Sequence, residues 1–338
     1  MAKLMNAVGP GSRLLLLGDK DQLASVEAGS VLGDLCQAAG VINRFPGSTQ
    51  AYLNSFVPAA GRRLGPEHLA QETDHPLAGR IVRLTHSRRF PDEFGIGRFS
   101  KAILNGAHDD VALFCAPAAD PHVAISDGYD DAAFEAFAEG YADYIREADP
   151  RAALRLLNRQ RVLCAVREGE RGLYGLNRRI ERYLEEQRLI RFTGEFYEHR
   201  PVIVTRNYYN LGLFNGDIGL VRKDARGQLR VFFEDSKGEL KSVLPGYLAQ
   251  VETVYAMTIH KSQGSEFDRV LLVLPDVPVP LLTRELLYTG VTRARSHVRI
   301  QAPLAVLTEC IRKSVERGSG IAGRLATWKF THTDHQNQ

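Results

Sequence analysis

A polar segment between two apolar runs constrains the fold of this chain more than any other feature. Residues 256–275 are AMTIHKSQGSEFDRVLLVLP. An apolar run over residues 254–259 leads into the polar segment, and a second run, 270–274, follows it. Short apolar runs without alternation are typical of strands buried on both faces of a parallel sheet. The stretch therefore predicts two core strands with a polar loop between them.

The composition sets broad limits on the class of protein. The chain of 338 residues can hold two or three domains, and its 44% hydrophobic and 25% charged residues are ordinary for a globular protein. A net charge of +3 is too small to indicate a nucleic-acid partner by itself. The four cysteines form no CxxC pair, which argues against a zinc site and against a disulfide framework.

The first residues of the chain and the lengths of its apolar runs indicate the cellular compartment. No apolar run approaches the length of a membrane span, and the first residues, MAKLMNAVGPGS, have no signal-peptide core. Together with the cysteine usage, these features predict a cytoplasmic protein without membrane contact.

Strand and helix signals alternate along much of the chain. We expect a buried strand at residues 14–17 followed by a helix, a long loop over residues 40–79, and a strand that ends in the basic loop HSRRF. Apolar residues recur at helical spacing over residues 131–158, and the segment RVLCAV predicts a strand. Leu176, Ile180 and Leu184 lie on one face of an amphipathic helix that follows.

Residues 195–250 differ from this pattern. They contain short β-rich runs separated by turn signals, among them Asn215-Gly216 and Arg226-Gly227. We expect a small antiparallel barrel inserted into the α/β domain.

Four polar loops adjoin apolar runs: GDKDQL, HSRRF, TIHKSQGSEF and YTGVTRAR. Each can be explained as a solvated turn or a helix cap. That explanation is weakest for the third loop, since a glycine among five hydrogen-bonding side chains is more than a surface turn needs. In an open parallel sheet, ligands bind outside the carboxyl ends of the strands, where such loops lie.

In this order the loops resemble motifs III to VI of superfamily 1 helicases of the RecD type. The stretches are LLLLGDKDQLASVEAGSVLGDLC, LTHSRRF, MTIHKSQGSEFDRVLLVLP and ELLYTGVTRAR, supported by LCAVREGERGLYGLNRRIE and LGLFNGDIGLV. The resemblance implies an α/β fold of the RecA-like P-loop helicase type with an inserted SH3-like β-barrel. Residues 1–80 would end the first RecA-like domain. Residues 81–194 and 251–338 would form the second, and residues 195–250 the barrel.

The resemblance also implies a site for ATP. Catalytic roles fall on Gln22 of motif III, Arg89 of motif IV and Arg293 of motif VI, the two arginines acting as arginine fingers on the γ-phosphate. Arg88 stands where an aromatic residue is more usual, and between Arg88 and Arg89 we favour Arg89. The nucleotide-binding set comprises Gly18, Asp19, Gln22, Arg89, Gly264, Glu266 and Arg293, with Glu266 accepting from ribose hydroxyls.

For DNA, the resemblance implies contacts from the third polar loop. The residues are Thr258, His260, Lys261, Ser262 and Gln263, of which Thr258 and Ser262 can donate to phosphates. Tyr208, Tyr209 and Phe214 of the barrel can stack on bases, although packing in the barrel core is an equal alternative for Phe214.

The chain contains no GxxxxGK[ST] sequence and no strand followed by an Asp-Glu pair. Members of the family carry these ATP and Mg²⁺ ligands ahead of motif III, so we expect that this chain is a fragment without metal ligands and inactive alone.

The complete protein would be the ATP-dependent helicase subunit of a RecBCD-type exodeoxyribonuclease V, acting on single-stranded DNA or duplex ends beside beta and gamma chains. A stand-alone 5′→3′ helicase and a motor-dead DNA-binding module are the alternatives.

Overall fold

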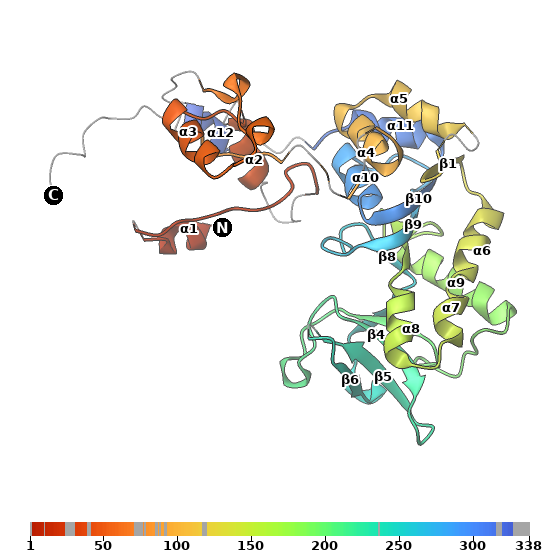
Figure 1. Ribbon diagram of the computed structural model, residues 1–338. Coiled ribbons are helices and arrows are strands. Elements are labelled where there is room, and N and C mark those ends of the chain that lie inside the picture. The colour runs from red at the N-terminus through yellow and green to blue at the C-terminus, as the bar shows by residue number, and fades with distance from the viewer. Residues whose placement is uncertain are drawn as a thin grey trace. The chain divides into compact units, whose positions relative to one another are not determined.

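The computed structural model describes most of the chain (Figure 1), namely residues 2–9, 11–23, 31–38, 42–70, Leu77, 79–84, Ser87, 89–90, 93–116, 120–235, 237–315 and 320–326. The chain divides into two compact units. The smaller unit comprises Met1–His86 with Glu316–Gln338, and the larger unit comprises Ser87–Val315.

A five-stranded parallel sheet forms the centre of the larger unit. Its strand order is β1-β10-β9-β2-β8, and every neighbouring pair is parallel. The strands are β1 (Val123–Asp127), β2 (Gln160–Cys164), β8 (Ala256–Thr258), β9 (Phe267–Val273) and β10 (Ala294–Ala302). The predicted runs thus become the neighbouring strands β8, β2 and β9, and β2 is buried along its whole length.

Helices cover both faces of this sheet (Figure 1). One core cluster packs side chains of alternate strand positions, such as Val162 and Leu271, against helices α6 to α9. On the other face, a Cβ added to Gly290 of α10 would lie only 3.1 Å from Leu272, so the glycine lets α10 pack closely on the sheet. The helices are α4 (Gly95–Asn105), α5 (His108–Ala112), α6 (Asp131–Glu139), α7 (Ala142–Arg146), α8 (Pro150–Leu157), α9 (Leu173–Glu186), α10 (Arg284–Val291) and α11 (Leu304–Arg312), with a 3-10 turn at Leu113–Cys115.

Local sequence explains where these helices begin. Asp130 and Asp149 cap α6 and α8 by accepting a backbone hydrogen bond, and Pro150 occupies the first turn of α8. The helical spacing predicted over residues 131–158 is therefore divided among three helices. The predicted apolar face of α9 is confirmed, because Leu176, Ile180 and Leu184 are fully buried.

A second sheet is antiparallel, in the order β6-β5-β4-β3-β7. Its strands are β3 (Pro201–Val204), β4 (Ile218–Lys223), β5 (Leu229–Glu234), β6 (Leu240–Val243) and β7 (Val251–Thr253), with 3-10 turns at Tyr209–Leu211 and Pro245–Tyr247. Gly216 and Gly227 have positive φ at the predicted turns. The antiparallel insertion is present, whereas the strand pairing does not show closure into an SH3-like barrel.

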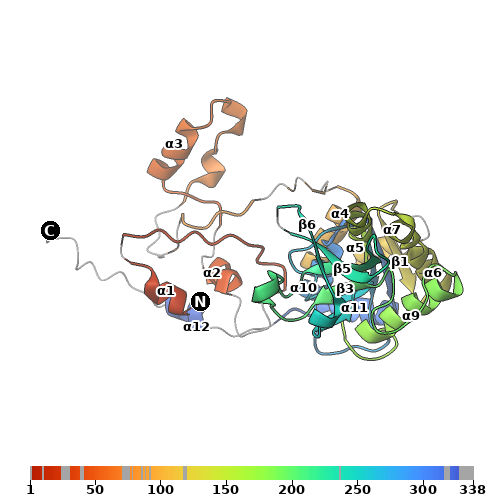
Figure 2. The same cartoon turned by 90° about the horizontal axis from the view of Figure 1, so that it is seen from below.

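The two sheets are fastened together by buried polar groups. Tyr141 donates to the Tyr255 carbonyl at 2.7 Å, and Tyr144 donates to the His199 carbonyl at 2.8 Å. Arg161 donates to the Val254 carbonyl. Figure 2 shows the antiparallel strands from below, in front of the helices of the same unit.

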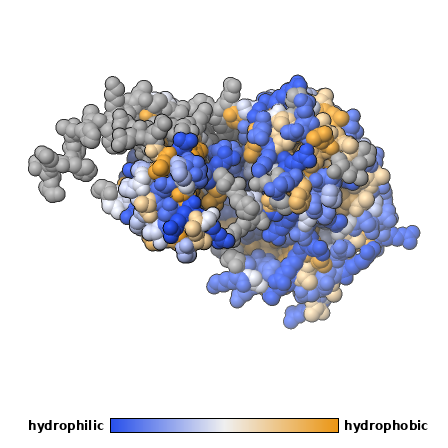
Figure 3. All heavy atoms as spheres, turned by 45° about the horizontal axis from the view of Figure 1, so that its top comes forward, coloured by the Kyte–Doolittle hydropathy of each residue, from blue (hydrophilic) through white to orange (hydrophobic). Residues whose placement is uncertain are grey.

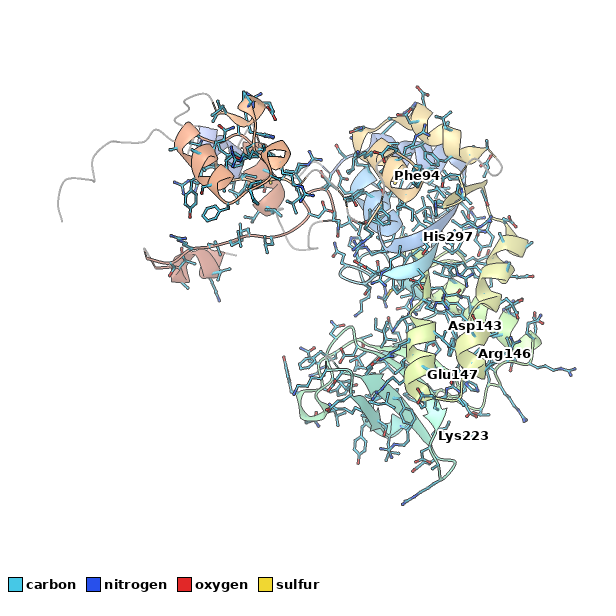
Figure 4. All side chains as sticks on the ribbon, viewed as in Figure 1. Phe94, Asp143, Arg146, Glu147, Lys223 and His297 are labelled. Carbon is cyan, nitrogen blue, oxygen red and sulfur yellow. The ribbon has the colours of Figure 1, made fainter. Side chains whose placement is uncertain are left out.

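The α7–α8 corner and β4 supply a second attachment. Arg222 of β4 donates to the carbonyls of Tyr144 at 2.5 Å and Glu147 at 2.8 Å. Figure 4 labels its neighbour Lys223 below Asp143, Arg146 and Glu147 of this corner.

The smaller unit is mainly helical. It contains α1 (Ala2–Ala7), α2 (Val31–Ala38), α3 (Gly47–Ser55) and α12 (Gly320–Ala326), with 3-10 turns at Ala60–Arg62 and Pro66–His68. Helix α12 packs against α2. The segment expected to be a long loop over residues 40–79 therefore contains a helix and two turns in its described part.

Two predicted strands are wrong. Residues 14–17 and 80–84 have no strand structure, and Leu15, Leu17 and Leu84 are exposed. A strand needs a hydrogen-bonding neighbour, and the pairing found in the described part of the smaller unit is the isolated bridge between Phe45 and Leu69. The extended chain at Arg83 bonds instead to the Asn43 side chain, at 2.7 and 2.8 Å.

The surface in Figure 3 is mostly hydrophilic, with hydrophobic side chains scattered over it. No helix within the described ranges has the length and apolar character needed to cross a membrane. All four cysteines are unbridged.

Candidate functional site

The β8–β9 loop, residues 259–266, is folded by its own hydrogen bonds. Ser262 is fully buried; its backbone N–H donates to the Thr258 carbonyl at 3.1 Å and its hydroxyl donates to the Ile259 carbonyl at 2.7 Å. The Lys261 N–H donates to the Thr258 hydroxyl at 3.2 Å. Gly264 has a φ of +85°, a conformation that glycine adopts without strain. The predicted polar loop is therefore a compact turn at the carboxyl end of β8.

This turn presents some of the predicted DNA-binding residues and encloses others. Gln263 is exposed, and His260, Lys261 and Thr258 are half-buried. The enclosed Ser262 hydroxyl has a backbone acceptor. The geometry gives Ser262 a part in closing the turn, and its predicted DNA contact stays a prediction.

Arg293 lies beneath the same turn and is only 4% exposed. Its Nε donates to the Thr289 carbonyl of α10, and its Nη1 donates to the Ser265 carbonyl, both at 3.1 Å. The Phe267 N–H donates to the Arg293 carbonyl at 2.8 Å. Arg293 therefore joins the β8–β9 loop to the end of α10.

Glu266, at the end of the loop, sits between two arginines. One carboxylate oxygen is paired with Arg89 Nη2, and the other accepts from Arg295 Nε at 2.9 Å. Arg89 Nη1 also donates to the Thr292 carbonyl at 3.1 Å. The three charged side chains are partly exposed, with Glu266 at 28%, so a ligand can reach them. Two guanidinium groups around one carboxylate can bind anionic oxygen atoms, while the carboxylate can accept from hydroxyl groups.

Arg295 is absent from the site predicted by sequence. The signal for it was present in TRAR, because residues two apart along a strand point to the same side. Arg293 and Arg295 flank the first residue of β10, Ala294, and both bond to the β8–β9 segment. Arg88 lies outside the described residues.

Lys261 connects the loop to the antiparallel sheet. Its ammonium group donates to the Asn215 side chain, in the connection between β3 and β4. Burial lowers the pKa of Lys261, and the nearby Glu252 carboxylate opposes that effect. Glu252 is itself paired with Arg167, at 2.6 Å. Neither the contact between Lys261 and Asn215 nor the ion pair of Glu252 with Arg167 was predicted from the sequence.

Exposed aromatic side chains lie close to Asn215. Tyr209 is 77% exposed and Phe214 is half exposed, and their ring centroids are 6.2 Å apart. Tyr208 instead packs on the core of the antiparallel sheet. Of the three aromatics suggested for stacking on bases, Tyr209 and Phe214 are therefore the accessible ones.

The remaining predicted residues, Gly18, Asp19 and Gln22, belong to the smaller unit. Asp19 accepts from the Gln22 side chain at 2.9 Å and from the Asp21 N–H at 3.0 Å. A Cβ on Gly18 would lie 2.8 Å from Leu32, so glycine allows α2 to pack there. The segment forms a local polar turn. Within the described ranges, no group of three or more His, Cys, Asp or Glu side chains is placed to hold a metal ion.

The segment that carries this site matches a known family model. Residues 253–300, which contain the β8–β9 loop, α10 and both Arg293 and Arg295, match the UvrD-like helicase C-terminal domain. This match and the parallel sheet establish the α/β helicase fold that the sequence predicted.

Curated relatives narrow the family further. The RecBCD enzyme subunit RecD of Haemophilus influenzae is 35% identical over 96% of this chain and 52% of that protein. RecD of Mycobacterium tuberculosis is 37% identical, over 96% of this chain and 51% of that protein. The predicted resemblance is confirmed, since the chain is homologous to RecD subunits along nearly its whole length. The chain spans about half the length of these curated relatives.

Two more distant likenesses complete the comparison. The ATP-dependent RecD2 DNA helicase of Deinococcus radiodurans is 31% identical over 87% of this chain and 33% of that protein. A crystal structure of Pif1 helicase from Bacteroides with ADP-AlF3 and single-stranded DNA is 15% identical over 66% of this chain and 51% of that one, with a TM-score of 0.37. A likeness as low as the latter supports no further argument.

Proposed function

We propose that this chain is the part of a RecD-type ATP-dependent DNA helicase that contributes the second RecA-like domain. The observation that carries the proposal is the cluster of Glu266 between Arg89 and Arg295, at the end of a loop that belongs to a UvrD-like helicase domain. Its guanidinium donors match the phosphate oxygens of a nucleoside triphosphate, and its carboxylate acceptor matches the ribose hydroxyl groups.

In this proposal the cluster serves the nucleotide. Arg89 supplies positive charge to the γ-phosphate as it is transferred, because phosphoryl transfer depends mainly on positioning and charge stabilisation. Glu266 accepts a hydrogen bond from the ribose, and Gly264 lets the backbone approach the ligand. Arg293 holds the loop and α10 in register, and its predicted role as a second finger requires it to leave the carbonyls that it now contacts.

The residues of this chain fit the phosphates and the ribose better than they fit a metal ion. Arginine side chains bind phosphate oxygens bidentately, whereas Mg²⁺ requires oxygen ligands such as carboxylates. Bound Mg²⁺ would neutralise charge on the phosphates, and we assign its ligands and the phosphate loop to the region of the whole protein that this chain, about half as long as its curated relatives, does not span. Gln22 would report the nucleotide state from the smaller unit. "Full-length protein" below means the chain together with that region.

The DNA strand is assigned to the outer side of the β8–β9 loop. Lys261, His260 and Gln263 are reachable there, with the Thr258 hydroxyl at the end of β8. Contacts of this kind go to phosphates and position the strand without reading its sequence. Tyr209 and Phe214 offer ring faces to bases farther along.

The relatives suggest the setting. By analogy with the RecD subunits, the full-length protein would act beside the beta and gamma chains, RecB and RecC, of exodeoxyribonuclease V in the repair of DNA ends. The RecD2 relative supports a second candidate, a helicase that acts alone. Co-purification with RecB and RecC homologues from the source organism would favour the first.

The test is DNA-stimulated ATP hydrolysis by the full-length protein. Arg89→Ala should lower the rate by about 10³–10⁵ while sparing ATP binding, in line with arginines that act in phosphoryl transfer. Arg98→Ala, an exposed arginine of α4 outside the cluster, is the matched control and should keep the normal rate. The 338-residue chain alone should not hydrolyse ATP above background. Normal turnover by Arg89→Ala, or turnover by the chain alone, would contradict the proposal.

A further inference from the structure

A cavity of about 390 Å³ lies between α9 and β7, away from the Glu266 cluster. Its volume is in the range of small-ligand pockets. Apolar atoms from Leu173 and Val251 and the ring of Tyr174 contribute to the lining, together with charged side chains. A flat molecule with a polar edge suits such a lining.

Two charged side chains of the lining have hydrogen-bonding atoms without a partner among the described residues. Arg200 is only 8% exposed; its Nε donates to the Thr253 hydroxyl at 3.0 Å and its Nη1 to the Glu195 carbonyl at 2.8 Å. Among the described residues, its Nη2 has no acceptor. Glu181 Oε1 accepts from Tyr197 at 2.6 Å and from Thr253 at 3.3 Å, while Oε2 accepts from no described residue. One donor and one acceptor of the lining are therefore available to a ligand.

The charged lining residues are two arginines and two glutamates, and further cations lie beside one of the glutamates, Glu252. Glu252 is paired with Arg167 at 2.6 Å, and Arg167 also donates to the Tyr174 hydroxyl. Lys261 lies close enough for Glu252 and Arg167 to affect its pKa. Arg178, exposed on α9, adds a further cation to the lining. Phosphates suit the outside of the cavity, and an uncharged group suits the inside.

We propose that the cavity receives one unstacked nucleobase of a single DNA strand whose neighbouring phosphates follow Arg167 and Lys261. This inference rests on the proposed function and adds a base-holding site to it. A nucleobase is a flat apolar body that carries both donors and acceptors on its edge, and proteins commonly hold splayed bases by stacking and by edge hydrogen bonds. All four bases offer a donor for Glu181 and an acceptor for Arg200, so the site holds a base without selecting it.

The experiment separates base from backbone. A fluorescent oligothymidylate carries one abasic site, moved stepwise along the strand, and its binding to the full-length protein is followed by anisotropy. Removing the base keeps every phosphate. We expect one position at which binding becomes about 5- to 100-fold weaker, as for loss of a stacked base.

Two pairs of variants locate that position in the cavity. Val251→Phe fills the cavity, and Val277→Phe places the same side chain at an exposed site outside it. Arg178→Ala removes a lining residue, and Arg182→Ala, one turn along α9, removes an exposed arginine that does not line it. In Val251→Phe and Arg178→Ala the position-dependent loss should shrink because the two changes are coupled. The controls should keep it in full.

The outcomes are distinct. An equal loss at every position, or a loss that persists unchanged in Val251→Phe and Arg178→Ala, overturns the inference while leaving strand binding intact. Competition by free thymidine monophosphate that Val251→Phe abolishes, without any position dependence on the oligomer, would assign the cavity to a small molecule and also overturn it. Failure of the wild-type protein to bind any oligomer would instead count against the proposed function.

Discussion

Two polar loops of this chain each follow a short apolar run. One run is a paired strand of a sheet, and the other is exposed and unpaired within the described residues. The β8–β9 loop follows a strand paired with β2, and its residues meet Arg89, Arg293 and Arg295 in one hydrogen-bonded cluster. The polar turn Gly18–Gln22 follows the run at residues 14–17, which is exposed and unpaired in the described part of the smaller unit.

The difference shows that an apolar run forms a strand only where a neighbouring strand is present to pair with it. Backbone N–H and C=O groups need partners from a neighbouring strand, and side chains need a face to cover. In the larger unit, β2 and β9 lie close in space to β8 and β10 and supply both. The run at residues 14–17 has neither within the described residues, and the polar turn after it is organised by local contacts, among them those that Asp19 makes with Asp21 and Gln22.

The largest expected effect contrasts a leucine from each region. Leu271→Asp places a charge in the centre of β9, where the side chain is fully buried, and should cost at least about 4 kcal/mol or prevent folding. Leu17→Asp alters a side chain that is 84% exposed and should change stability by less than about 0.5 kcal/mol. Urea unfolding of the 338-residue chain measures both. Equal losses for the two variants would show that the run at residues 14–17 is packed after all.

The next effect distinguishes two arginines of the site. Arg293→Ala should destabilise the larger unit by about 2–4 kcal/mol, because the carbonyls of Ser265 and Thr289 lose a buried donor. Arg295→Ala breaks a partly exposed ion pair, and such pairs contribute at most about 1 kcal/mol. Thermal unfolding followed by circular dichroism compares them. If Arg295→Ala proved the more damaging, the division into a structural and an accessible arginine would be wrong.

The smallest expected effect is a loss of stability of the larger unit at low pH, caused by protonation of His199. Burial, assisted by the positive charge of Arg222, lowers the pKa of His199 from 6.5 to about 4. Between these pH values His199 is protonated in the unfolded chain and neutral in the folded chain. The contribution of His199 to the free energy of unfolding is therefore complete above pH 6.5. It is lost, by roughly 1–3 kcal/mol, as the pH falls toward 4.

Urea unfolding at pH 7 and pH 4.5 tests this expectation. His199→Asn is the suitable variant, because residue 199 has a φ of +73° and asparagine tolerates that region better than most residues. The variant should lose less stability on acidification than the wild type. An unchanged pH dependence would assign the acid sensitivity to other groups.

The sequence was sufficient for the parts that depend on local pattern. Continuous apolar runs predicted β2, β8 and β9, helical spacing predicted α9, and turn signals predicted the antiparallel segment. Each of these signals is contained in a few residues, and the strand or helix that it predicts packs against other elements of the same unit. The exposed run at residues 14–17 carries the same signal, and sequence cannot tell whether a partner is present.

The site was only partly predictable for a related reason. An arginine after α10 was expected to face a ligand, and the structure encloses Arg293 because the β8–β9 loop folds over it from more than 25 residues away in the chain. The same fold leaves Arg295 accessible beside Glu266. Which of two nearby guanidinium groups reaches the surface depends on packing between distant segments, which a local motif does not contain.

The junction between the two sheets has a mechanical consequence. Val254 and Tyr255 alone separate β7 from β8, both are fully buried, and their carbonyls accept hydrogen bonds from Arg161 and Tyr141. A hinge needs residues whose dihedral angles are free to change, and these two are held. The antiparallel sheet and β8 should therefore move as one body, so that a shift of the strand carrying the β8–β9 loop reaches the insertion without bending at residues 254 and 255.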